Sequence, residues 1–406
     1  MFMVKSLSVT GLAGSTKRQE FDLNPDINIF WGLNGCGKSS LLKLISAAFR
    51  CSNKGLSEIP FKEFSAKFYD PDSNLTVERS ITRDGLTVSR HGREDEDVEV
   101  DELIKRLEML ESEDSKKEWG TAVFPADAPD AEVYANRRLP YTFLPTSRFV
   151  ESTGRYSFYR RTRTPEEMSD EGLARYFADE VGRRWAMYSS RSLMDVKRVQ
   201  QKGMAEILQI LLSGRKSKDS AQMPMSDPKQ AFSLVKAFLD EQDVFMPLRI
   251  EEFTEQYSER PELQNIVTRI QNTTNEVERI QQPQNSFLSV VNNLLSSGKR
   301  IELGSADLGR PTRENMSVYV NERRIDLSSI SSGERHLIQI MLITMTSEKM
   351  PVIIDEPELS LHVDWQEDLV ASMRAINPTA QLILASHSPE LQVGVEQSKI
   401  FRLGND

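Results

Sequence analysis

The chain has 406 residues, 38% of them hydrophobic and 28% charged, and its formal net charge at pH 7 is −10. A chain of this length and composition forms a real core and is expected to divide into two or three domains, which excludes a disordered or disulfide-stapled protein. The negative charge excludes a general polyanion binder, so any contact with nucleic acid has to come from a local basic patch.

The apolar segments are too short for export or for crossing a membrane. The N-terminal MFMVKSLSVTGLAGS has a shorter apolar core than a signal peptide needs. The longest apolar stretch, 337–345, is interrupted by Gln339 and is far short of a spanning helix. The two cysteines, Cys36 and Cys51, are typical of a reducing compartment. We therefore expect a soluble, cytoplasmic protein with no membrane partner.

The N-terminal region, residues 1–163, is predicted to be rich in strands. Residues 3–10 alternate as a short strand, and INIFWG (Ile27–Gly32) is a second one that runs into a glycine-rich loop and then a helix. Strand-like alternation returns over 61–90. The acidic run 93–102 and the charged helix after it are expected to form a solvated surface.

The middle region, residues 164–298, is predicted to be helical. Its start, TPEE, supplies a cap residue, a proline in the first turn and acids at the positive end of the helix dipole. Over 261–296, apolar residues keep a 3-4 spacing up to Pro283 and a second apolar stripe follows. This spacing predicts a short coiled-coil-like hairpin, although a helix packed on its own domain fits it equally. Further helices are expected at 195–213, 229–241 and 247–259.

The C-terminal region, residues 299–406, alternates strands with helices. SVYVNERRIDL is predicted to be a hairpin that turns at Asn321-Glu322. The strands VIID, LILAS and IFRLG follow, with a helix from about Asp364 after the first of them. Because this is α/β order, we expect the chain to begin one α/β domain, leave it through the helical region and return to complete it.

Residues 32–39, GLNGCGKS, match the phosphate-binding pattern G-x-x-x-x-G-K-[ST] between a predicted strand and a predicted helix. The glycines let successive backbone N–H groups surround a phosphate, and the helix dipole favours the anion. Lys38 is expected to reach the β- and γ-phosphates of ATP, and Ser39 to hold Mg²⁺. The expected binding residues are Gly32, Asn34, Gly35, Cys36, Gly37, Lys38, Ser39 and Ser40.

The segment PVIIDEPELSLHVDWQ (351–366) ends an apolar strand in two carboxylates, Asp355 and Glu356. In a phosphate-loop ATPase the second strand ends in an acid that supports Mg²⁺, which is the role expected for Asp355. Glu356 is then placed to orient or deprotonate the attacking water. Without the phosphate loop, two acids capping a helix N-terminus would be the better interpretation.

Three more segments follow in order: ISSGERHLIQI (330–340), ELSLH (358–362) and LILASHSPEL (382–391). Together with the phosphate loop and the two acids, they resemble the ABC-type ATPase head, closely over the first 50 and about the last 85 residues. The resemblance implies an α/β phosphate-loop ATPase head with a mixed sheet and an antiparallel β lobe. This head, formed by 1–163 and 299–406, would be split by a helical insert with a short coiled-coil-like hairpin.

The resemblance also assigns roles to individual positions. Residues 32–40 match the Walker A loop, Asp355 and Glu356 the Walker B aspartate and the catalytic glutamate, and 358–361 the loop that crosses the dimer interface. His387 matches the switch histidine that contacts the γ-phosphate. In that family the signature motif reaches the nucleotide of the opposite subunit, so hydrolysis needs an ATP-dependent homodimer. The residues that match the signature are Ser331, Ser332, Gly333 and Glu334.

The chain departs from this family at the glutamine that normally completes the coordination of Mg²⁺. The corresponding strand is Tyr141–Val150, YTFLPTSRFV. Thr146, Ser147 and Arg148 are the three candidates for the position of the glutamine, and the sequence leaves the choice open.

The split head and the wording of DEPELSLH and SHSPEL are similar to the RecF/SMC/Rad50-like branch. They are most similar to compact bacterial anti-phage ATPases, namely the subunits of Septu, retron-linked, PARIS and OLD systems. OLD proteins carry a C-terminal nuclease, whereas this chain stops about twenty residues after His387. At least three of the four histidines lie within or beside the ABC motifs, so the resemblance implies a separate effector nuclease. The histidines are His91, His336, His362 and His387.

The segment Arg137–Arg163 is basic and rich in aromatic residues, which makes it a candidate surface for DNA, RNA or an acidic phage protein. Arginines that pair with the acidic residues of 93–114 are the alternative. Three functions fit the sequence: an ATPase sensor or scaffold of an anti-phage complex, a RecF-like ATPase of DNA repair, and the motor of a transporter.

Overall fold

The computed structural model describes residues 2–52, 55–82, 86–91, 139–147, 151–152, 168–213, 227–295, 298–304 and 316–404. They form two compact units. We call the first the head unit, which comprises Met1–Arg184, Phe287–Gly304 and Met316–Asp406. The described residues of the second, the insert unit, lie within Trp185–Ser286.

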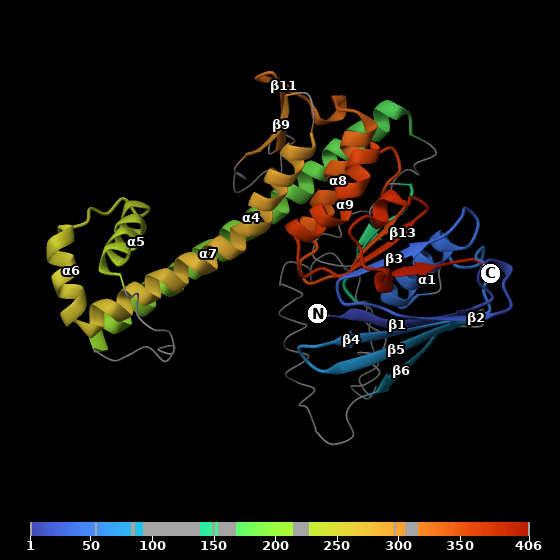
Figure 1. The fold of residues 1–406 in the computed structure, drawn as a ribbon, viewed down its shortest axis with the longest axis horizontal. Helices are drawn as coiled ribbons and strands as arrows, with labels where there is room; N and C mark the ends of the chain where they lie inside the picture. The colour runs from blue at the N-terminus through green and yellow to red at the C-terminus, as the bar shows by residue number, and fades with distance from the viewer. Residues whose placement is uncertain are drawn as a thin grey trace, which may run out of the picture. The chain divides into compact units, whose positions relative to one another are not determined.

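A six-stranded sheet forms the centre of the head unit, in the order β14-β3-β13-β12-β7-β8 (Figure 1). All neighbours are parallel except β7 and β8, which are antiparallel. The carboxyl ends of the parallel strands therefore meet at one edge of the sheet. The strands are β3 (Ile27–Trp31), β7 (Thr142–Leu144), β8 (Glu151–Ser152), β12 (Val352–Asp355), β13 (Leu382–Ser386) and β14 (Ile400–Arg402).

The helix α1 (Lys38–Arg50) lies between this sheet and an antiparallel β lobe. Its apolar face shares one core with side chains of both sheets, among them Ile353 of β12 and Phe64 of β4. Each large apolar side chain that is fully buried in this way stabilises the fold by about 1.5–3 kcal/mol. The lobe has the order β2-β1-β4-β5-β6. Its strands are β1 (Met3–Thr10), β2 (Arg18–Asp22), β4 (Glu63–Asp70), β5 (Leu75–Thr82) and β6 (Leu86–His91).

The helices α8 (Ser332–Thr346) and α9 (Val363–Ile376) lie on the side of the central sheet away from the lobe (Figure 1). A three-stranded sheet, β9 (Lys299–Leu303), β10 (Met316–Val320) and β11 (Arg323–Ile325), precedes α8 in the chain. Its predicted hairpin turn at Asn321-Glu322 is confirmed: both residues have positive φ, 46° and 68°, as a tight two-residue turn requires. Short 3₁₀ turns complete the unit at Leu12–Gly14, Leu327–Ser329, Glu390–Gln392 and Gln397–Lys399.

Four described helices lie in the insert unit or extend into it from the head unit. They are α4 (Asp170–Ser213), α5 (Pro228–Asp240), α6 (Ile250–Glu259) and α7 (Pro261–Leu294). Within the insert unit, α4 and α7 run antiparallel and close together (Figure 1). Gly203 packs against Thr273, whose Oγ1 would lie 2.4 Å from a Cβ on Gly203. Nearby, Arg269 forms a 2.6 Å ion pair with Glu206.

The expectation of a hairpin within 261–296 is wrong in its topology. α7 is one helix of 34 residues that continues through Pro283. A proline removes one backbone hydrogen bond and disfavours a helix interior, but it does not exclude one. The apolar stripe that predicted a hairpin packs instead on α4 and on the core of α5 and α6, as Val267 and Ile270 show. The α/β class, with a mixed sheet, an antiparallel lobe and a helical insert, is confirmed.

No described helix combines the length and the apolar character that crossing a lipid bilayer demands.

Candidate nucleotide site

The phosphate loop connects β3 to α1 and needs its glycines for conformation and for space. Gly35 and Gly37 have φ of 84° and 101°, in the region that favours glycine. At Gly32 a Cβ would lie 2.4 Å from the carbonyl oxygen of Leu403. Asn34 is exposed at the tip of the loop, and Cys36 is half-buried. The loop is thus a compact turn whose exit is the N-terminus of a helix.

The first turn of α1 presents backbone donors at this exit. The N–H groups of Lys38, Ser39 and Ser40 have no acceptor within the helix, because the first turn of any α-helix leaves its amides unpaired. Backbone amides and the helix dipole together favour an anion at this position. The arrangement therefore fits a bound phosphate chain.

Lys38 is buried beside the loop, with 5% of its surface exposed. Its Nζ donates to the carbonyl oxygens of Gly32 at 2.7 Å and Leu33 at 3.2 Å. The same Nζ lies 3.6 Å from Oε1 of Glu356. The ammonium is thereby held within reach of both the loop and the acid after β12.

Asp355 is the acid at the end of β12, and its carboxylate accepts hydrogen bonds from two hydroxyl groups. Ser39 Oγ donates to Oδ1 at 3.0 Å, and Thr146 Oγ1 donates to Oδ2 at 2.7 Å. A carboxylate and hydroxyls are the hard oxygen ligands that Mg²⁺ prefers, so the residues present fit this ion. Among the three candidates left open by the sequence, the structure brings Thr146 to Asp355, while Arg148 lies outside the described residues.

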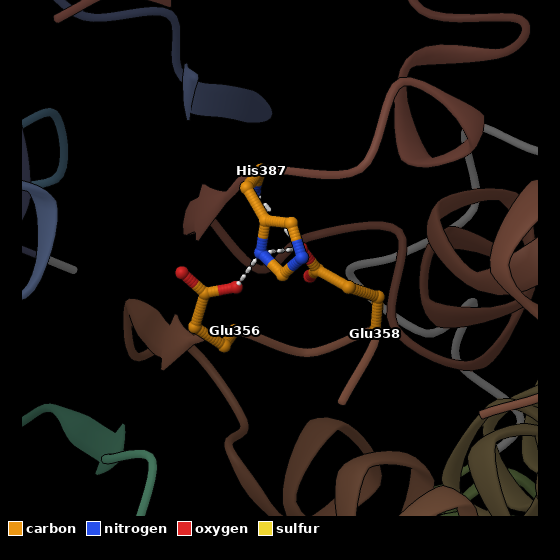
Figure 2. A group of neighbouring side chains, drawn as sticks. All are labelled: Glu356, Glu358 and His387. Atoms are coloured by element: carbon orange, nitrogen blue, oxygen red, sulfur yellow. Dashed lines mark hydrogen bonds and ion pairs between the residues drawn. The ribbon is translucent and has the colours of Figure 1, made fainter. Parts of the chain in front are cut away.

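Glu356, Glu358 and His387 form a compact cluster, with one ligand atom from each lying within 4.8 Å of the others (Figure 2). His387 Nδ1 contacts Oε2 of Glu356 and lies 3.2 Å from Oε1 of Glu358. Glu356 has φ of 51°, a left-handed conformation that side-chain-bearing residues rarely adopt. The catalytic glutamate and the switch histidine of the resemblance are thus in direct contact.

Glu358 is buried, and its role was not predicted beyond membership of the interface loop. Its Oε1 accepts hydrogen bonds from Ser386 Oγ and from the backbone N–H groups of His387 at 2.9 Å and Ser388 at 3.2 Å. Burial raises the pKa of the Glu358 carboxyl, against the hydrogen bonds from Ser386 and His387, which lower it. An acid two positions after Glu356 was the only sequence signal for this contact.

The signature segment begins α8 through a capping box. Ser331 Oγ accepts from the N–H of Glu334 at 3.3 Å, and Glu334 accepts from the N–H of Ser331 at 2.9 Å. Lys299 Nζ also donates to Glu334, at 2.7 Å. Ser331 and Ser332 are exposed, whereas Gly333 packs so closely on the interface loop that a Cβ there would lie 2.4 Å from the Ser360 oxygen. No hydrogen bond or ion pair within the described ranges joins this segment to residues 32–39 of the same chain.

Two other sets of predicted residues lie away from this site. His336 is buried in α8, and His362 caps the N-terminus of α9. The side chain of His91 and all seven arginines of Arg137–Arg163 lie outside the described residues, so the basic surface remains a prediction.

The sequence of this chain is similar to those of known proteins. Residues 27–393 match the family described as "AAA domain, putative AbiEii toxin, Type IV TA system". The retron Vc95 probable ATPase of Vibrio cholerae serotype O1 biovar El Tor is 30% identical over 115 residues, a match that covers 25% of this chain and 22% of the relative. The chain therefore spans about a fifth of the length of that relative.

Solved structures of Smc head domains are also similar. One is the head with an extended coiled coil bound to the C-terminal domain of ScpA from Pyrococcus furiosus, with a TM-score of 0.43, 14% identity and coverage of 97% of this chain and 91% of that one. Another is the head with a coiled coil and joint from Pyrococcus yayanosii, with a TM-score of 0.41, 13% identity and coverage of 97% and 93%.

Proposed function

Because the chain belongs to the family described as "AAA domain, putative AbiEii toxin, Type IV TA system" and has a retron-linked relative, we propose that it is an SMC/Rad50-like ATPase that binds and hydrolyses ATP within a bacterial anti-phage defence complex. In this proposal it is the sensor or scaffold of the complex. ATP-dependent pairing of two copies controls a separate effector subunit, which is a nuclease.

One observation carries the ATPase part of this proposal. The ends of β3, β12 and β13 bring a phosphate loop with Lys38, a hydroxyl–carboxylate pair at Asp355, and the Glu356–His387 contact to one edge of the sheet. Phosphoryl transfer needs mainly positioning and positive charge around the γ-phosphate, plus a group that takes a proton from water. These are the groups that meet here.

The hydrolytic step follows from these groups. The loop amides and Lys38 bind the phosphate oxygens, and Ser39 and Asp355 would hold Mg²⁺, which when bound neutralises charge on the β- and γ-oxygens. Glu356 accepts a proton from the attacking water as the water oxygen bonds to the γ-phosphorus. The bond from this phosphorus to the bridging oxygen breaks, and ADP leaves. His387 donates to the γ-phosphate.

The exposed start of α8 supports the pairing of two copies. The capping box uses the amide of Glu334, while the amides of Ser332 and Gly333 lie in the first turn, where no intrahelical acceptor exists. An anion is the natural partner of such a helix start. In the proposed dimer that anion is the γ-phosphate bound by the other copy.

Mass measurement in solution tests this proposal. Size-exclusion chromatography with light scattering, run without nucleotide, with ADP and with ATP·Mg²⁺, is expected to give twice the 46.2 kDa chain mass only with ATP. A single-copy mass in all three conditions would contradict the pairing. Tagged protein isolated from its native host is expected to retain a nuclease subunit.

A RecF-like role in DNA repair is the second candidate, favoured by the basic sequence of 137–163. It predicts ATP-dependent binding of duplex DNA that weakens steeply with salt, since basic residues would release counterions from the phosphates. Fluorescence anisotropy across a salt series measures this. Strong salt-sensitive binding without a retained effector would replace the defence role by the repair role.

A further inference from the structure

Glu358 joins two loops that end neighbouring strands of the central sheet. It belongs to the loop after β12, and its Oε1 accepts from Ser386, the last residue of β13, and from His387 and Ser388, which follow that strand. One oxygen, Oε1, accepts from the hydroxyl of Ser386 and from two consecutive backbone amides. Hydrogen bonds to a charged acceptor are about twice as strong as neutral ones, so this carboxylate determines the path of Ser386–Ser388.

The same oxygen also determines where the imidazole of His387 lies. Nδ1 is 3.2 Å from Oε1 of Glu358 and contacts Oε2 of Glu356. Figure 2 shows the ring with both acidic side chains directed at it. Glu356 holds a left-handed backbone conformation, and such a strained conformation persists where the surroundings impose it.

A structural role alone explains Glu358 poorly. The side chain is 4% exposed, and Oε2 is buried without a hydrogen-bond partner among the described residues. Burying a carboxylate away from a matching cation is unfavourable, so an apolar or amide side chain would stabilise this position at lower cost. The contacts that the acid does make all go to the segment that carries His387.

We propose that Glu358 is a positioning residue for ATP hydrolysis, which holds Ser386–Ser388 and the imidazole of His387 against Glu356. The inference rests on the proposed function, in which His387 meets the γ-phosphate and Glu356 the water. The described contacts of Glu358 include neither Lys38 nor the phosphate loop. Its loss therefore impairs turnover and leaves ATP affinity unchanged.

Steady-state kinetics and ATP titration of Glu358→Ala and Glu358→Gln test the inference. Glu358→Ala is expected to lower kcat about 10- to 100-fold, because a small misplacement of a reacting group has effects of this size, with the Kd for ATP within about twofold of wild type. Glu358→Gln keeps a carbonyl acceptor for the same donors and is expected to restore most of kcat. Glu390→Ala is the matched control, since Glu390 accepts from the side chain of Ser388 and no hydrogen bond or ion pair among the described residues joins it to His387.

Hydrogen exchange gives a readout that is independent of activity. The amides of His387 and Ser388 donate to Glu358, so a peptide over 382–391 is expected to exchange faster in Glu358→Ala and at the wild-type rate in Glu358→Gln. If Glu358→Ala does not fold, Glu358→Asp replaces it. Aspartate keeps the charge but withdraws the acceptor by one methylene group, and a kcat between those of the wild type and His387→Ala is expected.

A double variant tests whether Glu358 acts through the histidine. In a His387→Ala background, Glu358→Ala is expected to add less than about twofold to the loss, because residues that act as one unit are not additive. Wild-type kcat in Glu358→Ala, weakened ATP binding, or a fully additive loss in the double variant would each overturn the inference alone. If the wild-type protein does not hydrolyse ATP, or if its hydrolysis does not depend on Lys38, the proposed function is wrong and the inference fails with it.

Discussion

Lys38 and Glu356 form an ion pair, and each of the two side chains also contacts other groups. Lys38 donates to two carbonyl oxygens of its own loop, and Glu356 contacts His387. Because the proposed function assigns ATP binding to Lys38 and the transfer of a proton to Glu356, removing either side chain is expected to affect a different step. Two predictions at the scale of single residues separate these steps.

Lys38→Ala is expected to weaken ATP binding by at least about a hundredfold. The ammonium supplies charged hydrogen bonds worth about 1.5–3 kcal/mol each. Titration with a fluorescent ATP analogue measures the affinity. Lys43→Ala, an exposed lysine on the same helix, is the control. Unchanged affinity in Lys38→Ala would remove the assignment of the phosphate loop.

Glu356→Gln is expected to bind ATP normally and to lose about 10²- to 10⁴-fold in kcat, the usual contribution of a general base. Because hydrolysis is blocked, the variant is expected to remain in the paired state with ATP bound. Phosphate release measures the turnover, and light scattering measures the pairing. Turnover at the wild-type rate would mean that another group takes the proton.

Residues of the site differ in how far the sequence can predict them. Gly32 to Ser39 are adjacent in the chain, so their spacing alone implies their joint function. The contact of Glu358 with His387 joins residues 29 positions apart, and that of Thr146 with Asp355 joins residues 209 apart. Such contacts depend on which strands become neighbours, and no local pattern encodes that. The sequence therefore leaves Thr146 as one candidate of three and gives Glu358 no separate role.

At the scale of elements, the start of α8 separates nucleotide binding from pairing. Ser332 is exposed in the first turn, next to Gly333, which is packed on the interface loop. Ser332→Arg places a bulky cation at the proposed contact with the second copy. ATP affinity is expected to stay at the wild-type value, while the ATP-dependent doubling of mass is lost.

Ser57→Arg makes the same exchange at an exposed serine of the head unit that lies outside the motifs, and it is expected to pair as the wild type does. Light scattering with ATP·Mg²⁺ compares the two variants. Normal pairing of Ser332→Arg would place the contact between copies elsewhere.

Whole helices and strands were predicted correctly where the pattern of apolar residues fitted only one type of secondary structure. The strands β12 and β13 and the hairpin at Asn321-Glu322 were predicted from apolar runs and turn residues, and they are present. The prediction of a hairpin in place of α7 was wrong because an apolar stripe indicates that a helix packs on another element but does not identify that element. Its partner α4 begins about ninety residues earlier in the chain, and Pro283 suggested a break that the packing of α7 does not require.

At the scale of the molecule, the two ends of the chain hold each other in the central sheet. β14 pairs with β3, and Lys399 Nζ lies 2.8 Å from Oδ2 of Asp26. Gln381, just before β13, bonds both the N–H and the oxygen of Val4 in β1. Residues near both ends of the given sequence therefore contribute contacts to the head unit.

The Asp26–Lys399 pair gives a prediction for the dependence of stability on pH. Burial alone would raise the pKa of Asp26, but the hydrogen bond and charge of Lys399 and the amide of Ile27 outweigh it and hold this pKa below 3.8. The folded pKa is lowered, so the stabilisation is complete above the unfolded pKa and is lost as pH falls through the folded pKa. Asp26→Asn is therefore expected to lower Tm at pH 5 and to reduce the further fall between pH 5 and pH 3.

Differential scanning fluorimetry over this range measures the effect. Asp22→Asn, at an exposed position of β2, is the control and is expected to follow the wild-type profile. Equal slopes for Asp26→Asn and the wild type would show that the pair adds nothing to acid sensitivity.

The position of β3 between β13 and β14 also has a consequence for biosynthesis. The ribosome makes β3 and the phosphate loop long before it makes β13 and β14. These two strands, which lie on either side of β3 in the sheet, appear only after residue 381. Until residues 382–402 have been made, β3 has unpaired edges, and closing such distant contacts is slow. A nascent chain of this protein is therefore expected to lack nucleotide affinity, and to need protection from aggregation, until residues 382–402 have emerged.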